Sequence, residues 1–135
     1  MNIFVDGSYS NQNKIGVGAY IIIDSNTINT LTDLTIKDLK TKLSKDIVYK
    51  TFEDAKGSTD VEQKILDIAL QDPKIGKFVT IYTDCQKTKS NDKYSVVHVK
   101  GHTKQENRNN QDKIFDVVDK AVRKRLRQLV KKIDI

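Results

Sequence analysis

Three acidic side chains of this chain stand where an expected strand ends or an expected helix begins. Asp6 follows the apolar run Ile3-Phe4-Val5, Asp84 follows the apolar residues 79–82, and Glu62 lies just after Ser58-Thr59. Converging carboxylates repel one another unless a cation lies between them, and Mg²⁺ prefers such hard oxygen ligands. Two divalent ions about 4 Å apart can activate a water and stabilise the leaving oxygen of a phosphodiester. These residues therefore predict metal-dependent phosphoryl chemistry.

Each of the three acids also has an ordinary structural explanation. Asp6-Gly7 is a common turn pair, and an acid in the first turn of a helix, as expected for Glu62, stabilises the helix dipole. Asp84 has the stronger functional signal, because a largely apolar strand leads directly into it and sites form at the strand ends of α/β sheets.

A histidine and a further carboxylate would complete such a site. His102 lies on a loop in Lys100-Gly101-His102, where it can transfer a proton near neutral pH, although a loop histidine can equally be an inert surface residue. His98 falls within an expected strand, and we expect it to pack there.

The last helix offers Asp112, Asp116 and Asp119 on nearly one face. Asp112 opens the helix and is explained by capping. Asp119 falls within the apolar arc of the helix, which consists of Val118, Val122, Leu126 and Val130. A mid-helix carboxylate in that arc has no comparable explanation. Asp112 and Asp119 are about 10 Å apart along the axis, so only one can reach the other carboxylates. We favour Asp119 and keep Asp112 as the alternative.

Hydrophobic periodicity and turn residues predict the elements that position these side chains. The expected strands are residues 2–6, 16–23, 46–52, 78–83 and 94–99. One helix is expected after Gly57 until Asp72-Pro73, a second over 111–133, and one or two helical turns over 36–43. This order predicts an α/β fold in one domain, residues 1–135. Its five-stranded mixed sheet has antiparallel first strands and is flanked by helices.

In this order the segments resemble the type I ribonuclease H family. The resemblance is carried by Val5-Asp6-Gly7-Ser8, the glycine-containing hairpin of residues 11–20, Ser58-Thr59-x-x-Glu62, Tyr82-Thr83-Asp84-x-Gln86 and Lys100-Gly101-His102. It implies a ribonuclease H-like fold and a nuclease that cuts the RNA strand of RNA–DNA hybrids. The products would carry 5′-phosphate and 3′-hydroxyl ends. It also implies two Mg²⁺ or Mn²⁺ ions held by Asp6, Glu62, Asp84 and Asp119, with His102 as a catalytic residue.

The resemblance further implies contacts with the minor groove of the hybrid. These would come from the backbone near Gly7 and from Ser8, Ser58, Thr59 and Gln86. The 2′-hydroxyl displayed in that groove distinguishes RNA from DNA. Two other functions remain open: a non-catalytic nucleic-acid-binding module, and another ribonuclease H-like nuclease that acts on DNA.

The chain departs from longer family members between the fourth and fifth strands. Residues 87–93 stand where those members carry extra helices and a basic protrusion that binds the DNA strand. The loop after His102 also lacks the family's usual Asn four residues before either Asp112 or Asp119, and residues 27–45 are an insertion outside the resemblance. Substrate affinity must therefore come from elsewhere, either from the C-terminal helix or from a protein partner.

The net charge of +6 lies entirely in the last quarter of the chain. Residues 1–99 hold 13 basic and 13 acidic residues, whereas residues 100–135 hold 11 basic and 5 acidic ones. A localised basic stripe suits a phosphate backbone, although a solvated helix face has the same composition.

Composition places the chain among soluble globular proteins, with 31% charged and 37% hydrophobic residues. It shows no membrane-spanning run and no signal peptide. The single cysteine, Cys85, excludes an internal disulfide and suits a reducing compartment. We therefore expect a cytoplasmic protein, and we expect it to be a monomer.

Overall fold

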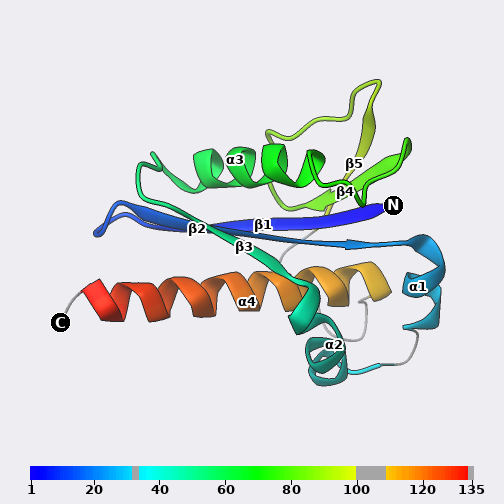
Figure 1. Ribbon diagram of the computed structural model, residues 1–135, viewed down its shortest axis with the longest axis horizontal. Helices are drawn as coiled ribbons and strands as arrows, with labels where there is room; N and C mark the ends of the chain where they lie inside the picture. Colours follow the sequence, from blue (N-terminus) through cyan, green and yellow to red (C-terminus); the bar gives the residue numbers. More distant parts are fainter. Residues whose placement is uncertain (32–33, 100–108, 134–135) are drawn as a thin grey trace.

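The computed structural model describes residues 1–31, 34–99 and 109–133 (Figure 1). The predicted Lys100-Gly101-His102 segment lies outside the described residues. In chain order the elements are β1 (Asn2–Ser10), β2 (Ile15–Ile23), α1 (Ser25–Thr30), α2 (Ile36–Leu43), the short 3-10 helix η1 (Ser44–Asp46), β3 (Val48–Phe52), α3 (Ser58–Leu70), β4 (Val79–Thr83), β5 (Tyr94–His98) and α4 (Asn110–Ile133).

The five strands form one mixed sheet in the order β3-β2-β1-β4-β5. β1 and β2 are antiparallel, as are β2 and β3, whereas β4 runs parallel to β1 and β5 runs parallel to β4. The predicted fold class is confirmed: this is an α/β fold with antiparallel first strands and flanking helices. The arrangement is consistent with a ribonuclease H-like fold.

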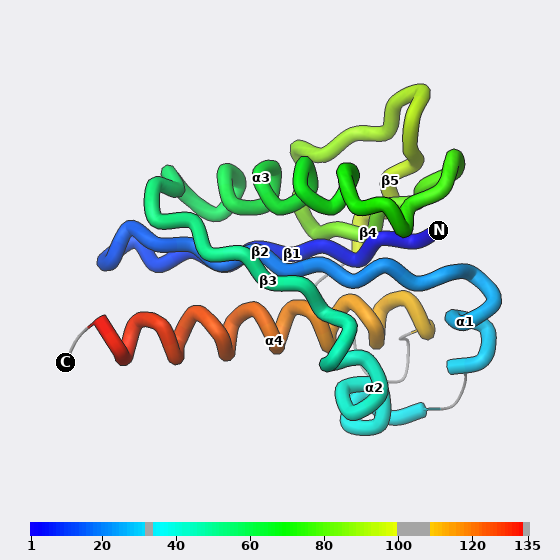
Figure 2. Tube along the Cα trace, in the orientation of Figure 1, coloured from blue at the N-terminus to red at the C-terminus, as the bar shows by residue number. Residues whose placement is uncertain are grey.

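Helices cover both faces of the sheet (Figures 1 and 2). Because side chains alternate along a strand, Ile3 and Val5 of β1 pack on the α3 side, and Phe4 between them packs on the α4 side. α1 and α2 lie on the same side as α4, and their residues Ile28, Leu31, Leu39 and Leu43 join its hydrophobic cluster. Asp6 follows Phe4 by two positions and therefore shares the α4 side of β1.

The bounds of β1 and β3 differ from the prediction, and one helix was not predicted. β1 continues to Ser10 because it pairs with β2 along the whole hairpin, whose turn places Lys14 at φ 56°. β3 begins only at Val48, since the preceding residues form η1. α1 was not predicted: it has six residues, and Asp24 caps it by accepting a hydrogen bond from the Thr27 N–H at 2.6 Å.

Among the described residues, no helix combines the length and the apolarity needed to cross a bilayer.

Candidate metal centre

Asp6 and Asp84 lie just beyond the end of the parallel pairing between β1 and β4. The parallel pairing of β1 with β4 includes Phe4 opposite Tyr82, whose rings stack at 4.5 Å and 10°. Two residues further along each strand stand Asp6 and Asp84. β4 ends at Thr83 whereas β1 continues to Ser10, so the edge of β1 beyond Phe4 has no strand partner on the β4 side among the described pairs. The two carboxylates lie where the strands separate.

Glycines allow α3 to pack very closely on the other side of the hairpin. Gly7 and Gly18 face each other across β1 and β2, and Gly16 lies on the same face. A Cβ at Gly16 would lie 2.2 Å from Val61 Cγ2, and one at Gly18 would lie 2.5 Å from Ile65 Cβ. A Cβ at Gly7 would lie 3.0 Å from Cγ of Glu62. The bare backbone therefore brings the start of α3, and with it Glu62, against β1.

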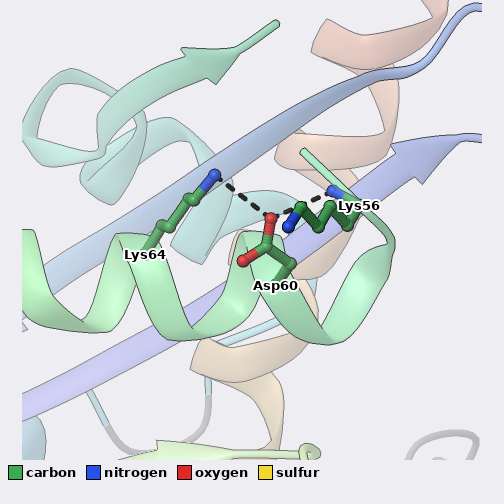
Figure 3. Close-up of polar contacts among 3 residues, drawn as sticks. All are labelled: Lys56, Asp60 and Lys64. Atoms are coloured by element: carbon green, nitrogen blue, oxygen red, sulfur yellow. Dashed lines mark hydrogen bonds and ion pairs between the residues drawn. The ribbon is translucent and has the colours of Figure 1, made fainter. Parts of the chain in front are cut away.

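Asp60, rather than Glu62, stabilises the first turn of α3 (Figure 3). Its carboxylate accepts a hydrogen bond from the Lys56 N–H at 3.0 Å and forms an ion pair with Lys64 at 3.1 Å. These contacts lower the pKa of Asp60. Gly57, which precedes the helix, has φ 153°, a conformation that favours glycine. The acid that stabilises the start of α3 is therefore Asp60, and this role does not explain Glu62.

The carboxylates of Asp6, Glu62 and Asp84 come together as one group, which we call the carboxylate cluster. Each contributes an oxygen, and these oxygens all lie within 4.8 Å of one another. Asp6 is 3% exposed, while Glu62 and Asp84 are half-buried. The structure therefore brings together the three acids that the sequence pattern singled out.

Burial and neighbouring acids make the ionised form of Asp6 unfavourable. Burial is the largest cause, followed by a hydrogen bond with the Asp119 side chain and by the charges of Asp84 and Asp119. Together they raise the pKa of Asp6 to about 10, although the Gly7 N–H favours the charged form. Without a cation, Asp6 is protonated at neutral pH.

Burial and neighbouring acids also disfavour the ionised form of Glu62, but less than that of Asp6. Burial raises the pKa of Glu62 to about 7, with Asp84 adding to the increase through its charge and a hydrogen bond. Hydrogen bonds from Cys85 and Asp6 act in the opposite direction. Such carboxyl–carboxyl hydrogen bonds need a proton on at least one partner. The cluster therefore holds protons that a divalent cation would replace.

The two alternatives for the fourth carboxylate lie in different environments. Asp119 in the middle of α4 shares a hydrogen bond with Asp6 and forms an ion pair with Arg123 at 3.1 Å. Asp112 is the third residue of α4 and takes part in a reciprocal cap: the Asn109 side chain accepts from the Asp112 N–H at 2.8 Å, and the Asp112 carboxylate accepts from the Asn109 N–H at 3.3 Å. Asp119 thus adjoins the carboxylate cluster, whereas Asp112 is occupied at the start of α4.

The donor set fits a hard divalent cation. The carboxylate cluster supplies only oxygen ligands, which suit Mg²⁺ and Mn²⁺. No lysine or arginine forms an ion pair with Asp6, Glu62 or Asp84 in the part of the chain that the structure describes. A buried carboxylate without a cationic partner is expensive. A bound cation would remove that cost.

The predicted substrate contacts lie close in sequence to the three acids of the carboxylate cluster. Gly7 and Ser8 continue β1 beyond Asp6, and both are half-buried. Ser58 and Thr59 lie one turn before Glu62 on α3, and Ser58 is exposed. Gln86, two residues after Asp84, is also exposed. All five flank the three acids closely in sequence, on the elements that carry them.

The sequence pattern missed a network that holds the loop after β4. Thr88 is buried, and its hydroxyl accepts a hydrogen bond from Gln63 of α3 at 3.0 Å. The His98 Nε2 lies 2.8 Å from the Thr88 carbonyl oxygen, and the Thr88 N–H donates to the Cys85 carbonyl at 3.2 Å. His98 therefore bonds to this loop through its ring, with its side chain exposed rather than packed as expected. Polar residues in a loop gave no signal of this network.

The glycine contacts had a signal that sequence reasoning did not use. Gly16 and Gly18 alternate within an apolar strand, and alternate positions share one face. Glycines at such positions indicate close approach by another backbone or helix.

A scan against protein-family models finds no match for this chain, and a search of curated proteins finds no relative.

Proposed function

We propose that this chain is a metal-dependent endonuclease that hydrolyses the RNA strand of RNA–DNA hybrids. The observation that carries the proposal is the convergence of Asp6, Glu62 and Asp84 within 4.8 Å, beside Asp119. A protein that merely binds nucleic acid gains nothing from acids directed at phosphates. The motif order along the chain favours a hybrid nuclease over a DNA nuclease.

The four acids would hold two Mg²⁺ or Mn²⁺ ions, which supply an activated water and neutralise charge on the leaving oxygen. Asp6 lies within β1, and Asp84 lies one residue after the end of β4. Glu62 comes from the opposite helix layer. The exposed Ser58 and Gln86 are free to contact the minor groove, where a ribose 2′-hydroxyl can be recognised. We also propose that the protein acts in the cytoplasm, since its single cysteine is unpaired.

The test is cleavage of an end-labelled RNA–DNA hybrid by the purified chain in Mg²⁺, Mn²⁺ or EDTA. Single-stranded RNA, duplex RNA and duplex DNA are assayed in parallel as alternative substrates. The variant Asp84→Asn controls for contaminating nucleases. Metal-dependent cutting of the hybrid alone, lost in the variant, supports the proposal. Cutting of DNA instead favours the related DNA nuclease. Hybrid binding without cutting in either metal favours a non-catalytic binding module.

A further inference from the structure

The C-terminal half of α4 has a strongly cationic surface. Residues 120–133 contain seven lysines and arginines and no acid. All seven side chains are exposed, among them Lys120 at 64% and Arg123 at 52%. The remaining ones are Lys124, Arg125, Arg127, Lys131 and Lys132. A surface of this kind repels itself and attracts polyanions.

Two contacts fix how this half of the helix is oriented. Asp119 shares a hydrogen bond with Asp6, so its flank of α4 faces the carboxylate cluster. The guanidinium of Arg125 lies 3.9 Å from the centre of the Tyr49 ring, so the flank of Arg125 faces β3. At about 100° per residue, the two positions are roughly 120° apart around the helix.

Five of the seven cations fall on the flank that continues from Asp119. We call them the cationic row: Lys120, Arg123, Lys124, Arg127 and Lys131. At about 100° per residue they lie roughly 40° to 140° from Asp119, on the side away from Arg125. Arg125 and Lys132 occupy the opposite flank. The row therefore starts at Lys120, directly after Asp119, and continues along α4 toward its C-terminus.

The helix that carries the row extends away from the candidate metal centre. α4 runs along the sheet, and its C-terminal half extends toward the β1–β2 turn (Figures 1 and 2). From Asp119 to Lys131 the axis rises by about 18 Å, at 1.5 Å per residue. This corresponds to about five nucleotides of a strand at 3.4 Å each.

Two members of the row already neutralise acids next to the centre. Arg123 pairs with Asp119 at 3.1 Å and Lys120 pairs with Asp116 at 3.0 Å. Lys124, Arg127 and Lys131 take part in none of the ion pairs found among the described residues. Their charges are available to an external anion.

We infer that the cationic row binds the phosphate backbone of the nucleic-acid substrate, about one to five nucleotides to one side of the scissile bond. This inference rests on the proposed function, because it takes the carboxylate cluster as the point of cleavage. A nucleic-acid backbone carries regularly spaced negative charges, which suit a row of cations. The row begins beside the carboxylate cluster, where a phosphodiester would be cut.

The test compares two charge-matched triple variants of the full chain. Lys124→Gln/Arg127→Gln/Lys131→Gln removes three charges from the row. Lys37→Gln/Lys40→Gln/Lys42→Gln removes three exposed charges from α2 and serves as the control. Hybrid binding is measured by fluorescence anisotropy in EDTA, where a metal-dependent nuclease does not cut, over a range of salt concentrations. Circular dichroism checks that both variants fold.

The row variant should weaken binding at least about tenfold and reduce the slope of log K against log salt by about one per cation removed. The α2 variant should change the slope by less than one. Equal losses in both variants would show that only net charge matters and would overturn the inference. An unchanged slope in the row variant would also overturn it.

Substrate length gives a second readout. Shortening the hybrid to fewer than about five base pairs on one side of the cleavage point should weaken binding by the wild type but not by the row variant. Tighter binding to phosphatidylserine vesicles than to the hybrid would overturn the inference in favour of a membrane surface. Cleavage is assayed separately: cutting with an unchanged slope removes this inference alone. A reduced slope without cutting removes the proposed function and leaves only binding of the phosphate backbone by the row.

Discussion

The side chains of Asp6 and Asp119 share a hydrogen bond across the interface between the sheet and α4. Two carboxyl groups can do this only while one of them keeps its proton. The metal-free protein therefore stores protons at the place where a divalent cation would bind. This relationship makes the candidate metal centre testable without any assay of catalysis.

Replacing Asp6 by Asn should separate stability from activity. Asn removes a buried acid that burial and its neighbours disfavour, so the metal-free variant should be more stable by about 1 kcal/mol, which raises Tm by roughly 4 °C. The same variant should lose hybrid cleavage and any stabilisation by Mg²⁺. Thermal unfolding in EDTA and in Mg²⁺ measures both effects. A metal-free Tm below that of the wild type would contradict this account of Asp6.

Stability in EDTA should fall as the pH rises from about 5 to 7.5. The folded pKa values of Asp6 and Glu62, about 10 and about 7, lie above their ordinary values of 3.8 and 4.5. The unfolded chain therefore releases these protons first, and deprotonation favours unfolding throughout this window. Urea unfolding at several pH values measures the trend. The double variant Asp6→Asn/Glu62→Gln should flatten it, and an unchanged trend in that variant would refute the assignment.

Stabilisation by Mg²⁺ should grow as the pH rises from about 6 to 8. The cation competes with protons for the carboxylates, so its apparent affinity rises as Glu62 becomes easier to deprotonate. The increase in Tm caused by a fixed Mg²⁺ concentration should therefore be larger at pH 8 than at pH 6. A pH-independent increase would mean that the ion binds away from the carboxylate cluster.

The two alternatives for the fourth carboxylate should respond differently to substitution. Asp119→Asn should reduce cleavage strongly, because this side chain adjoins Asp6. Asp112→Ala should cost about 0.5–1 kcal/mol of stability, because it removes the carboxylate that accepts from the Asn109 N–H at the start of α4, with cleavage retained. Cleavage rates and urea unfolding of both variants decide the matter, and the reverse pattern would identify Asp112 as the ligand.

The close approach of α3 can be tested with a paired substitution. Gly16→Ala should destabilise the protein by about 1–3 kcal/mol, because the new methyl group meets Val61 Cγ2 at 2.2 Å. Removing that atom with Val61→Ala should partly rescue Gly16→Ala, although Val61→Ala alone creates a cavity. A double-mutant cycle measures the coupling. Strictly additive effects would argue against the contact.

The loop that carries Asp84 should depend on Thr88. Thr88→Val keeps the shape but leaves the Gln63 amide without its 3.0 Å acceptor. We expect a lower kcat with little change in KM, since Asp84 would be less well fixed. Thr88→Ser, which keeps the hydroxyl, is the matched control and should restore the rate. Equal activity of the Val and Ser variants would limit Thr88 to an ordinary packing role.

Local patterns in the sequence were enough to predict the strands, the long helices and the acids at their ends. α2 spans residues 36–43 as expected, and α4 begins within one residue of its predicted start. Such features depend on neighbouring residues alone: side-chain alternation, helical spacing, and the turn-forming Gly57 and Asp72-Pro73. The short α1 escaped prediction because its six residues have no hydrophobic periodicity, only the cap from Asp24.

By itself the sequence determined which carboxylates were available and that Asp6 and Asp84 follow stretches expected to form strands. Only the tertiary structure decided that Asp119 meets Asp6 while the Asp112 carboxylate bonds to Asn109 at the start of α4. It also decided that Asp60 rather than Glu62 stabilises the start of α3. These outcomes depend on how a helix is rotated and translated on the sheet. That placement is set by the packing of residues far apart in the chain, such as Val61 against Gly16, and no local pattern encodes it.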